Sequence, residues 1–234
     1  MSEPAPRRRP RPLGVAILAL IALIGVALFA SLSLDEGDTD PIEIDGAGEV
    51  RKLVGGIPQL EARLGEDNAA VTIEVFNDLQ CTDCAGWQVD VIEPLIADEV
   101  RPGDVKLEFR HWSMTERPSG VSSYGAVSAG LQAQQWQFIE LFFHNQDEAE
   151  RRGVTQEFLD EVAKGVLNLN VEQWQNDFDE PDVKETLESD DLEAIEERIP
   201  TEPGAIVTGP ESEVKLVETP TLAEIRAAID EVSG

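Results

Sequence analysis

The feature that most restricts the fold of this chain is a pair of cysteines lying between a predicted strand and a predicted helix. Cys81 and Cys84 are the two cysteines of the sequence, and two residues separate them. Residues 71–76 (VTIEVF) are β-branched and aromatic, which predicts a strand that ends shortly before Cys81. Apolar residues then recur at near-helical spacing and predict a helix from the cysteines to about residue 99, with a kink at Pro94. These apolar residues are Trp87, Val91, Leu95 and Val100.

A C-x-x-C pair at the start of a helix is suited to thiol–disulfide chemistry. The first sulfur lies over free backbone N–H groups at the positive end of the helix dipole, which stabilise the reactive thiolate. A disulfide scaffold uses more cysteines than this chain has. Structural zinc uses about four ligands, and His111 and His144 do not complete such a set at the required spacing. The pattern therefore predicts a redox pair and no metal site, with an inert or purely structural pair as the alternative.

Beyond the predicted helix, the chain alternates between strand and helix patterns. Residues 105–110 alternate with period two and predict a second strand, while residues 205–208 and 214–217 predict a hairpin. A helical block lies between these strands, and Thr155 and Thr221 have the character of helix N-caps. The predicted order is therefore strand, helix, strand, helical block, hairpin and helix.

The N-terminal region has the pattern of a membrane anchor. Residues 14–34 form an uncharged run of 21 residues, whose length as a helix matches the hydrocarbon thickness of a bilayer, about 30 Å. Four arginines precede the run and acidic residues follow it, so the positive-inside bias predicts a cytoplasmic N-terminus and an extracytoplasmic C-terminal domain. The arginines are Arg7, Arg8, Arg9 and Arg11. A cleaved signal peptide is the alternative, although its apolar region is usually shorter and precedes a small-residue cleavage site.

These patterns divide the chain into a basic cytoplasmic arm (1–12), a transmembrane anchor (13–34), an acidic linker (35–48) and one folded domain (49–234) with a helical insertion at about 121–199. After the anchor, 14 basic residues stand against 46 acidic residues, a net charge of about −32. Such a field repels nucleic acid and anionic lipid headgroups. We therefore predict a single-pass protein of the cell membrane with no nucleic-acid partner.

The residues around the cysteines resemble a known family. Residues 76–84 (FNDLQCTDC) match the F-x-D-x-x-C-x-x-C pattern of the DsbA-like proteins of the thioredoxin superfamily. The downstream KLEFRH sequence that ends at His111 is similar to their second core strand. Trp136 and Phe158, with their apolar neighbours, resemble parts of their helical insertion. The resemblance covers residues 49–233 and implies an α/β thioredoxin fold with a helical insertion.

The resemblance also implies a disulfide oxidoreductase that needs no metal or organic cofactor. Cys81 is then the attacking thiol and Cys84 the resolving thiol, and the partners are client proteins with thiols or disulfides and a redox-recycling partner. The family places a cis-proline opposite the disulfide, at the start of a strand. Pro200 and Pro203 both compete for this role, and we choose Pro203 because the apolar strand begins just after it.

The motif departs from the family between its cysteines, where Thr82 and Asp83 replace the more frequent Pro-His or Pro-Tyr. The carboxylates of Asp83 and of Glu202, before the cis-proline, are expected to raise the pKa of the Cys81 thiol and to make the couple less oxidising. Oxidase, isomerase and reductase directions therefore stay open. Asp78 is either a proton shuttle for the resolving thiol or a loop residue that caps the helix or forms an Asx turn. The alternative function is a membrane-tethered binding or scaffold module with a redox-inert disulfide.

Overall fold

The computed structural model describes residues 41–112, 120–200 and 202–234. The predicted cytoplasmic arm (1–12) and transmembrane anchor (13–34) lie outside these residues, as do residues 35–40 of the predicted linker. In the described part of the chain, no helix combines the length and the apolar character that a membrane crossing requires. The structure therefore leaves the anchor as a prediction from sequence.

The folded unit begins earlier than the predicted boundary at residue 49. It extends from Ile42, which is buried, to Gly234. Helix α2 (Ala47–Val54) begins inside the segment predicted as an acidic linker and buries Val50 and Val54. The sequence concealed this helix because it is short and its two buried valines stand among charged and glycine residues.

A six-stranded mixed sheet forms the centre of the fold, with the strand order β1-β2-β4-β3-β5-β6. The strands are β1 (Gln59–Leu60), β2 (Arg63–Leu64), β3 (Val71–Asn77), β4 (Val105–His111), β5 (Gly204–Thr208) and β6 (Glu213–Leu216). The central strands β3 and β4 are parallel, and the other neighbouring pairs are antiparallel. The two predicted strands and the predicted hairpin are confirmed, whereas the short β1 and β2 at the sheet edge were not predicted.

The helix after the cysteines runs without a break to Val100, in four consecutive segments. These are α3 (Thr82–Trp87), η1 (Gln88–Ile92), α4 (Glu93–Leu95) and η2 (Ile96–Val100), of which η1 and η2 are π-helical. Pro94 has no N–H to donate to the preceding turn, and π-helical segments lie on both sides of it. The chain thus passes through the predicted kink position in helical form, with its hydrogen bonding rearranged. We call these four segments the active-site helix.

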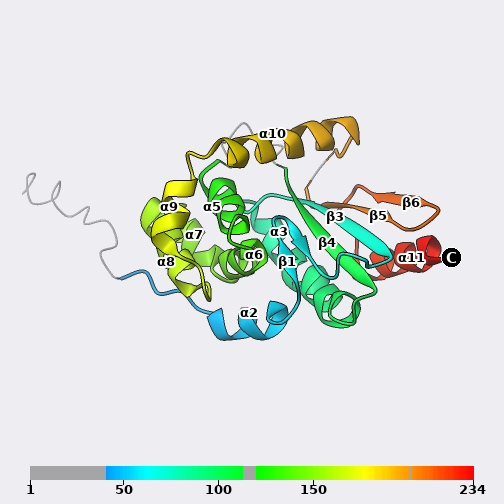
Figure 1. Ribbon diagram of the computed structural model, residues 1–234, viewed down its shortest axis with the longest axis horizontal. Coiled ribbons are helices and arrows are strands. Elements are labelled where there is room, and N and C mark those ends of the chain that lie inside the picture. Colours follow the sequence, from blue (N-terminus) through cyan, green and yellow to red (C-terminus); the bar gives the residue numbers. More distant parts are fainter. Residues whose placement is uncertain (1–40, 113–119, 201) are drawn as a thin grey trace, which may run out of the picture. The chain divides into compact units, whose positions relative to one another are not determined.

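The helical block occupies the stretch for which an insertion was predicted. Its members are α5 (Gly120–Gly130), α6 (Gln135–His144), α7 (Gln146–Arg152), α8 (Gln156–Gly165), α9 (Val171–Asp177) and α10 (Pro181–Glu196), and α11 (Leu222–Ser233) follows the hairpin. Figure 1 shows α5 to α9 gathered together beside the sheet. Both predicted N-caps are confirmed: the Thr155 hydroxyl accepts from Phe158 N–H at 3.2 Å, and Thr221 forms a capping box with Glu224.

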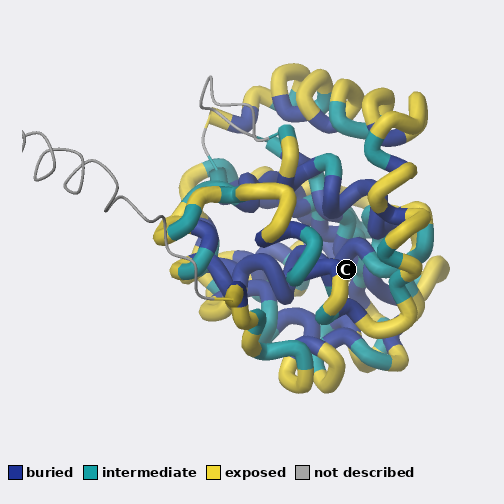
Figure 2. The backbone as a smooth tube through the Cα atoms, turned by 90° about the vertical axis from the view of Figure 1, so that its left-hand side faces the viewer, coloured by how far each residue is buried: buried dark blue, intermediate teal, exposed yellow. Residues whose placement is uncertain are grey.

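The two faces of the sheet are covered by different helices. Val75 lies in the main core together with Ile225 of α11. Its neighbour Phe76 points to the opposite face, where it packs with Ile206 and with Ala194 of α10. Buried positions accordingly concentrate in the interior and exposed ones at the periphery (Figure 2). The sheet is thus sandwiched between helices, with the cysteines at one end of its central strand.

Candidate active site

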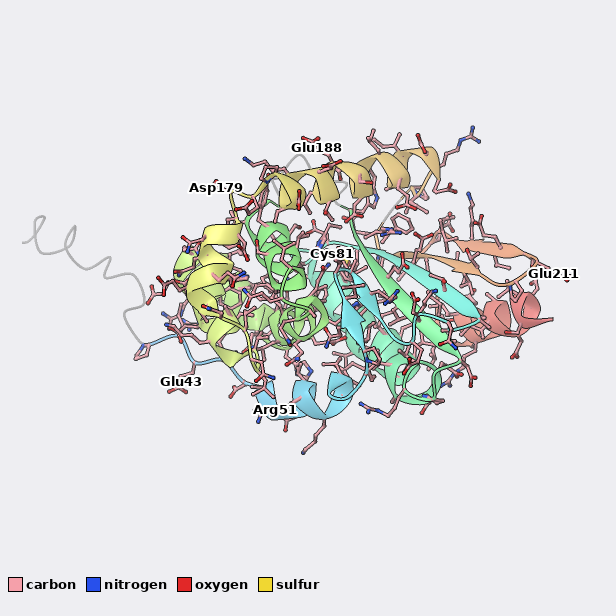
Figure 3. All side chains as sticks on the ribbon, viewed as in Figure 1. Glu43, Arg51, Cys81, Asp179, Glu188 and Glu211 are labelled. Atoms are coloured by element: carbon pink, nitrogen blue, oxygen red, sulfur yellow. A yellow bond between two sulfur atoms is a disulfide. The ribbon has the colours of Figure 1, made fainter. Side chains whose placement is uncertain are left out.

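The cysteine pair lies at the junction of β3 and the active-site helix, as the sequence predicts. Cys81 is the N-cap residue of α3 and has an extended backbone, with φ −86° and ψ 114°. Its N–H donates to the carbonyl oxygen of Asp78 at 3.1 Å, and the N–H of Cys84 donates to the carbonyl oxygen of Cys81 at 3.1 Å. The two cysteines form a disulfide, with their Cα atoms 5.2 Å apart. In Figure 3, Cys81 is labelled near the middle of the view, where the strands meet the helices.

The two cysteines differ in exposure. Cys84 is fully buried and belongs to the main core, whereas Cys81 is partly exposed. A second molecule can therefore reach the partly exposed Cys81 but not the buried Cys84. This asymmetry suits one attacking and one resolving cysteine, because exchange begins at the accessible sulfur.

The cis peptide bond recorded among the described residues joins Glu202 and Pro203. This agrees with the choice of Pro203 over Pro200. Strand β5 begins directly after it and pairs antiparallel with β3, with Gly204 opposite Phe76. Continuing this register by one residue places Pro203 opposite Asn77, at the end of β3 from which the cysteine loop departs. The predicted proline and the predicted cysteines therefore lie at the same end of the sheet.

The polar residues around the motif have distinct local roles. A side-chain oxygen of the buried Asp78 accepts from the N–H of Gln80 at 2.9 Å, which favours the turn-forming interpretation over the proton shuttle. Thr82 donates its hydroxyl hydrogen to a carboxylate oxygen of Glu150 on α7, which links the start of the active-site helix to the helical block. Asp83 is exposed in the first turn of α3, and Glu202 is partly buried.

The end of β4 lies beside the end of β3 and contains a buried histidine. His111 pairs with Asn77 in the parallel register and packs its ring on Phe109, with the ring centroids 4.7 Å apart. Its Nε2 lies 3.2 Å from Nε2 of Gln135, and burial lowers the pKa of His111 to about 3. His111 is therefore an uncharged packed residue at neutral pH.

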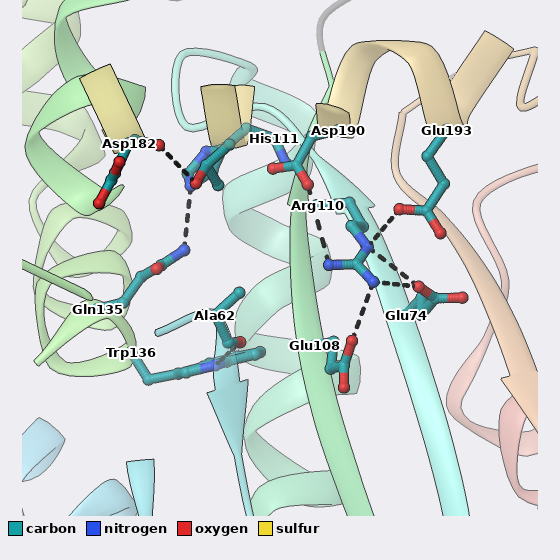
Figure 4. A network of polar contacts seen from close by, with 11 residues as sticks. Ala62, Glu74, Glu108, Arg110, His111, Gln135, Trp136, Asp182, Asp190 and Glu193 are labelled. Carbon is teal, nitrogen blue, oxygen red and sulfur yellow. Dashed lines mark hydrogen bonds and ion pairs between the residues drawn. The ribbon is translucent and has the colours of Figure 1, made fainter. Parts of the chain in front are cut away.

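Arg110, the residue before this histidine, is the centre of a polar network between the sheet and α10 (Figure 4). Its Nε donates to Glu74 at 3.0 Å and lies 2.8 Å from Glu193, and its Nη2 donates to Glu108 at 2.9 Å. Asp190 lies 3.9 Å from Nη1 of Arg110. Burial opposes the charge of Arg110, but the surrounding carboxylates raise the pKa of Arg110 above its ordinary value. One cation therefore compensates four acidic side chains.

Comparison with protein-family models matches residues 59–231 to a family described as thioredoxin. The match includes the sheet from its first strand, the cysteine pair, the cis-proline and the helical block. This chain belongs to the thioredoxin family.

Relatives of this thioredoxin-family chain include proteins named for disulfide bond formation. It is 27% identical over 149 residues to a probable disulfide bond formation protein D of Bacillus cereus, covering 62% of this chain and 69% of the relative. It is 26% identical over 141 residues to disulfide bond formation protein D of Bacillus subtilis, covering 58% of this chain and 64% of that protein.

Solved structures share its fold. The structure of oxidised BdbD from Bacillus subtilis superposes with a TM-score of 0.64 at 23% identity, covering 78% of this chain and 99% of that one. Alpha-DsbA1 of Wolbachia pipientis superposes with a TM-score of 0.61 at 17% identity, covering 73% and 89%. These likenesses establish the thioredoxin-like fold with its helical insertion, as the sequence analysis expected.

The thioredoxin-family domain also contains a buried acid that the sequence analysis missed. Glu140 of α6 is fully buried, and its Oε1 accepts from Nε2 of Gln88 at 2.8 Å. Burial is the main cause that raises the pKa of Glu140 to about 8. A single carboxyl group among the aromatic and aliphatic residues of QWQFIELFFH was the sequence signal for it.

The space beside the motif is an open depression rather than a closed cofactor cavity. Its volume is about 510 Å³, and its walls include Thr82, Val89, Phe143 and Asp147. Within the described ranges, no group of three or more His, Cys, Asp or Glu side chains is arranged to hold a metal ion. Its cysteine pair and its relatives named for disulfide bond formation show that this thioredoxin-family chain is a thiol–disulfide oxidoreductase.

Proposed function

We propose that this chain exchanges the Cys81–Cys84 disulfide with dithiols of client proteins on the outer side of the cell membrane. The observation that carries the proposal is the asymmetry of the pair: Cys81 is partly exposed at the start of a helix, and Cys84 is buried one turn further on. The relatives that are named disulfide bond formation proteins support the same reaction.

The exchange proceeds through a mixed disulfide on Cys81. A client thiolate attacks the sulfur of Cys81, and Cys84 leaves as a thiolate that takes up a proton. A second client thiolate then attacks the client sulfur of the mixed disulfide and releases Cys81 as a thiolate. The client loses two electrons and the enzyme pair gains them, and a redox-recycling partner must remove them again. Run backwards, the same steps reduce a client disulfide.

The membrane location rests on the N-terminal sequence. The uncharged 21-residue run at 14–34 has the length of a membrane-spanning helix, and the arginine cluster before it favours a cytoplasmic N-terminus. Disulfides persist outside the cytoplasm, which suits the redox pair. Protease added to intact cells stripped of their wall should therefore digest the domain after the anchor. Protection of that domain until the membrane is dissolved would contradict the outward orientation.

A trapping experiment tests the exchange itself. In a Cys84→Ala chain, Cys81 should form mixed disulfides with clients that are not resolved, so adducts should accumulate on non-reducing gels and disappear with reductant. A Cys81→Ala chain is the matched control and should accumulate few adducts, because Cys84 is buried. If neither variant forms adducts, the pair is structural, and the scaffold interpretation replaces the proposed exchange.

A further inference from the structure

Gln88 lies one helical turn after Cys84 on the same buried face of the active-site helix. Its backbone N–H donates to the carbonyl oxygen of Cys84, and both side chains are fully buried. Side chains four residues apart on a helix are neighbours, with Cβ atoms about 5–6 Å apart. Glu140 contacts the Gln88 amide from α6. The carboxyl group therefore lies in the buried interior beside Gln88, the helical neighbour of the resolving cysteine.

The hydrogen bonding of this pair is complete only if Glu140 is protonated. Nε2 of Gln88 donates to Oε1 of Glu140 at 2.8 Å. The remaining oxygens, Oε1 of Gln88 and Oε2 of Glu140, are both buried without a partner among the described residues. Two acceptor oxygens cannot satisfy each other, whereas a proton on Oε2 makes it a donor. A carboxylic acid and an amide can then form two reciprocal hydrogen bonds, which would satisfy both atoms.

The charged groups around Glu140 act on its ionisation in opposite directions. Glu93 of α4 faces it and favours the protonated form, whereas His144 of α6 favours the carboxylate. His144 itself lies 3.2 Å from Glu93 and is also influenced by Glu49 of α2. Burial outweighs these contributions, so that the pKa of Glu140 rises to about 8 and the group retains its proton at neutral pH.

We propose that Glu140 is a positioning residue of the exchange reaction: in its protonated form it pairs with Gln88 and keeps the surroundings of Cys84 free of negative charge. The inference rests on the proposed exchange at the cysteine pair. When Glu140 ionises, a carboxylate faces the dry region that Cys84 occupies, and the pair with Gln88 loses one of its two hydrogen bonds. The buried negative charge opposes formation of a thiolate on Cys84.

The step that responds is the attack of Cys84 on the mixed disulfide. The Cys84 thiol first releases its proton to solvent. Its thiolate then forms the bond to the Cys81 sulfur, the bond from Cys81 to the client breaks, and the client sulfur leaves as a thiolate that takes up a proton. The enzyme pair is oxidised and the client sulfur is reduced. An isolated thiol would give a rate that rises with pH, whereas ionisation of Glu140 should flatten that rise above about pH 8.

Stopped-flow kinetics of the reduced full-length chain with an aromatic disulfide that releases a coloured thiolate can isolate this step. The first release depends on reagent concentration and reports attack by Cys81. The second is independent of concentration and reports attack by Cys84. In Glu140→Gln the second rate should match wild type near neutral pH and keep rising above it. The variant should then exceed wild type by about threefold or more at high pH, because a facing charge can shift a pKa by a unit or more.

Two further variants separate this role from general packing. Gln88→Leu removes the hydrogen bond that lowers the pKa of Glu140, so the flattening should move to higher pH. Glu93→Gln removes a carboxylate that raises the pKa of Glu140 but leaves the pair with Gln88 intact. In this variant the rate of the second release should still flatten, at a slightly lower pH than in wild type.

Parallel wild-type and Glu140→Gln profiles over the whole pH range, with a clear second release, would overturn the role of Glu140 and leave the exchange intact. If wild type shows no second release, the exchange fails, and the inference fails with it. Should Glu140→Gln not fold, infrared spectroscopy of the carboxyl groups gives a second measurement. It uses an Asp190→Asn chain, because the pKa of Asp190 is also raised, to about 7, and its protonated carboxyl group would overlap with that of Glu140. A protonated-carboxyl band that disappears near pH 8 supports the inference. Its absence at neutral pH overturns the inference.

Discussion

Buried carboxyl groups lie on two sides of this domain, and each side manages their charge differently. Between the sheet and α10, the guanidinium of Arg110 contacts Glu74, Glu108 and Glu193. Beside the active-site helix, Glu140 contacts the neutral amide of Gln88 and is kept neutral by a raised pKa. The first region neutralises carboxylates with a cation, whereas the second does so with a proton.

The comparison shows why the neutral arrangement lies near the cysteines. A fixed guanidinium beside Cys84 would stabilise its thiolate at every pH, and a fixed carboxylate would oppose it at every pH. A protonated acid does neither while it retains its proton. On the side of α10, the ion pairs of Arg110 link that helix to the sheet.

The largest effect should follow from removal of the cation. Arg110→Met leaves four acidic side chains without their shared partner, so the free energy of unfolding should fall by about 3–4 kcal/mol near pH 7.5, in the range for broken buried ion pairs. The loss should be smaller near pH 5, where some of the carboxylates take up protons. Chemical denaturation at both pH values measures it.

The matched control for this change is Arg226→Met. Arg226 pairs with Asp98 and Glu99 at an exposed site, and the loss should stay below about 1 kcal/mol. Equal losses for the two variants would show that the network around Arg110 acts as an ordinary surface cluster.

The second effect concerns the acid that is neutralised by a proton. Burial raises the pKa of Glu140 from 4.5 to about 8, so its contribution to stability is fully present below about pH 4.5 and is lost as pH rises through 8. Glu140→Gln retains a group that can donate and accept but cannot ionise. Its stability relative to wild type should therefore increase by about 2–3 kcal/mol between pH 5.5 and pH 7.5, at about 1.4 kcal/mol per pH unit.

Denaturation curves across this pH range check the prediction, and Glu188→Gln serves as the control because Glu188 is exposed on α10. A constant difference between Glu140→Gln and wild type at all pH values would mean that Glu140 is ionised in the folded protein throughout.

The third effect is a change in the free energy of unfolding at Asp190, which is intermediate between the acids paired with Arg110 and the protonated Glu140. Asp190 accepts from the backbone N–H of His111 at 2.9 Å, but its distance to Nη1 of Arg110 is 3.9 Å. Burial raises the pKa of Asp190 to about 7 despite these contacts, so its contribution to stability is lost as pH rises from about 4 through 7. Asp190→Asn should gain about 1–2 kcal/mol relative to wild type between pH 5 and pH 6.5.

Thermal or chemical unfolding of the two proteins as a function of pH measures this gain. A double variant with Arg110→Met tests the coupling to the cation. In that background the gain from Asp190→Asn should be larger, because the attraction that lowers the pKa of Asp190 is absent. An unchanged gain would place Asp190 outside the network of Arg110.

The smallest effect should come from Asp83, because solvent screens its exposed carboxylate. Asp83 is exposed in the first turn of α3, next to the cysteines. Asp83→Asn should lower the pKa of the Cys81 thiol slightly and make the reduction potential less negative by at most a few tens of millivolts, because about 30 mV corresponds to 1.4 kcal/mol. Equilibration with glutathione buffers and alkylation rates measure the two quantities.

Asp83→His should continue both changes in the same direction, since it can add a positive charge. Unfolding free energies of these variants should stay close to wild type. If the potential does not move in either variant, the carboxylate of Asp83 has no influence on the sulfur pair, and the tuning inferred from the motif is wrong.

Several features of the site could be predicted because their signals are local. The strand before Cys81, the helix after Cys84 and the caps at Thr155 and Thr221 depend on side chains within a few residues of one another. Pro203 was identifiable because the strand pattern begins directly after it, and the cis bond lies there. Periodicity and capping are properties of neighbouring residues, so the linear sequence contains them.

Other features were decided only by tertiary packing. Gln88 and Glu140 are 52 residues apart, and Arg110 meets Asp190 across the sheet–helix interface. Whether an acidic residue is exposed, paired or protonated depends on which segments cover it, since burial and facing charges set the pKa. The sequence by itself determined where the sulfur pair lies and what chemistry it has. The packing of α6 and α10 determined which carboxyl groups near it are charged, because electrostatic energies depend on distances that no local pattern encodes.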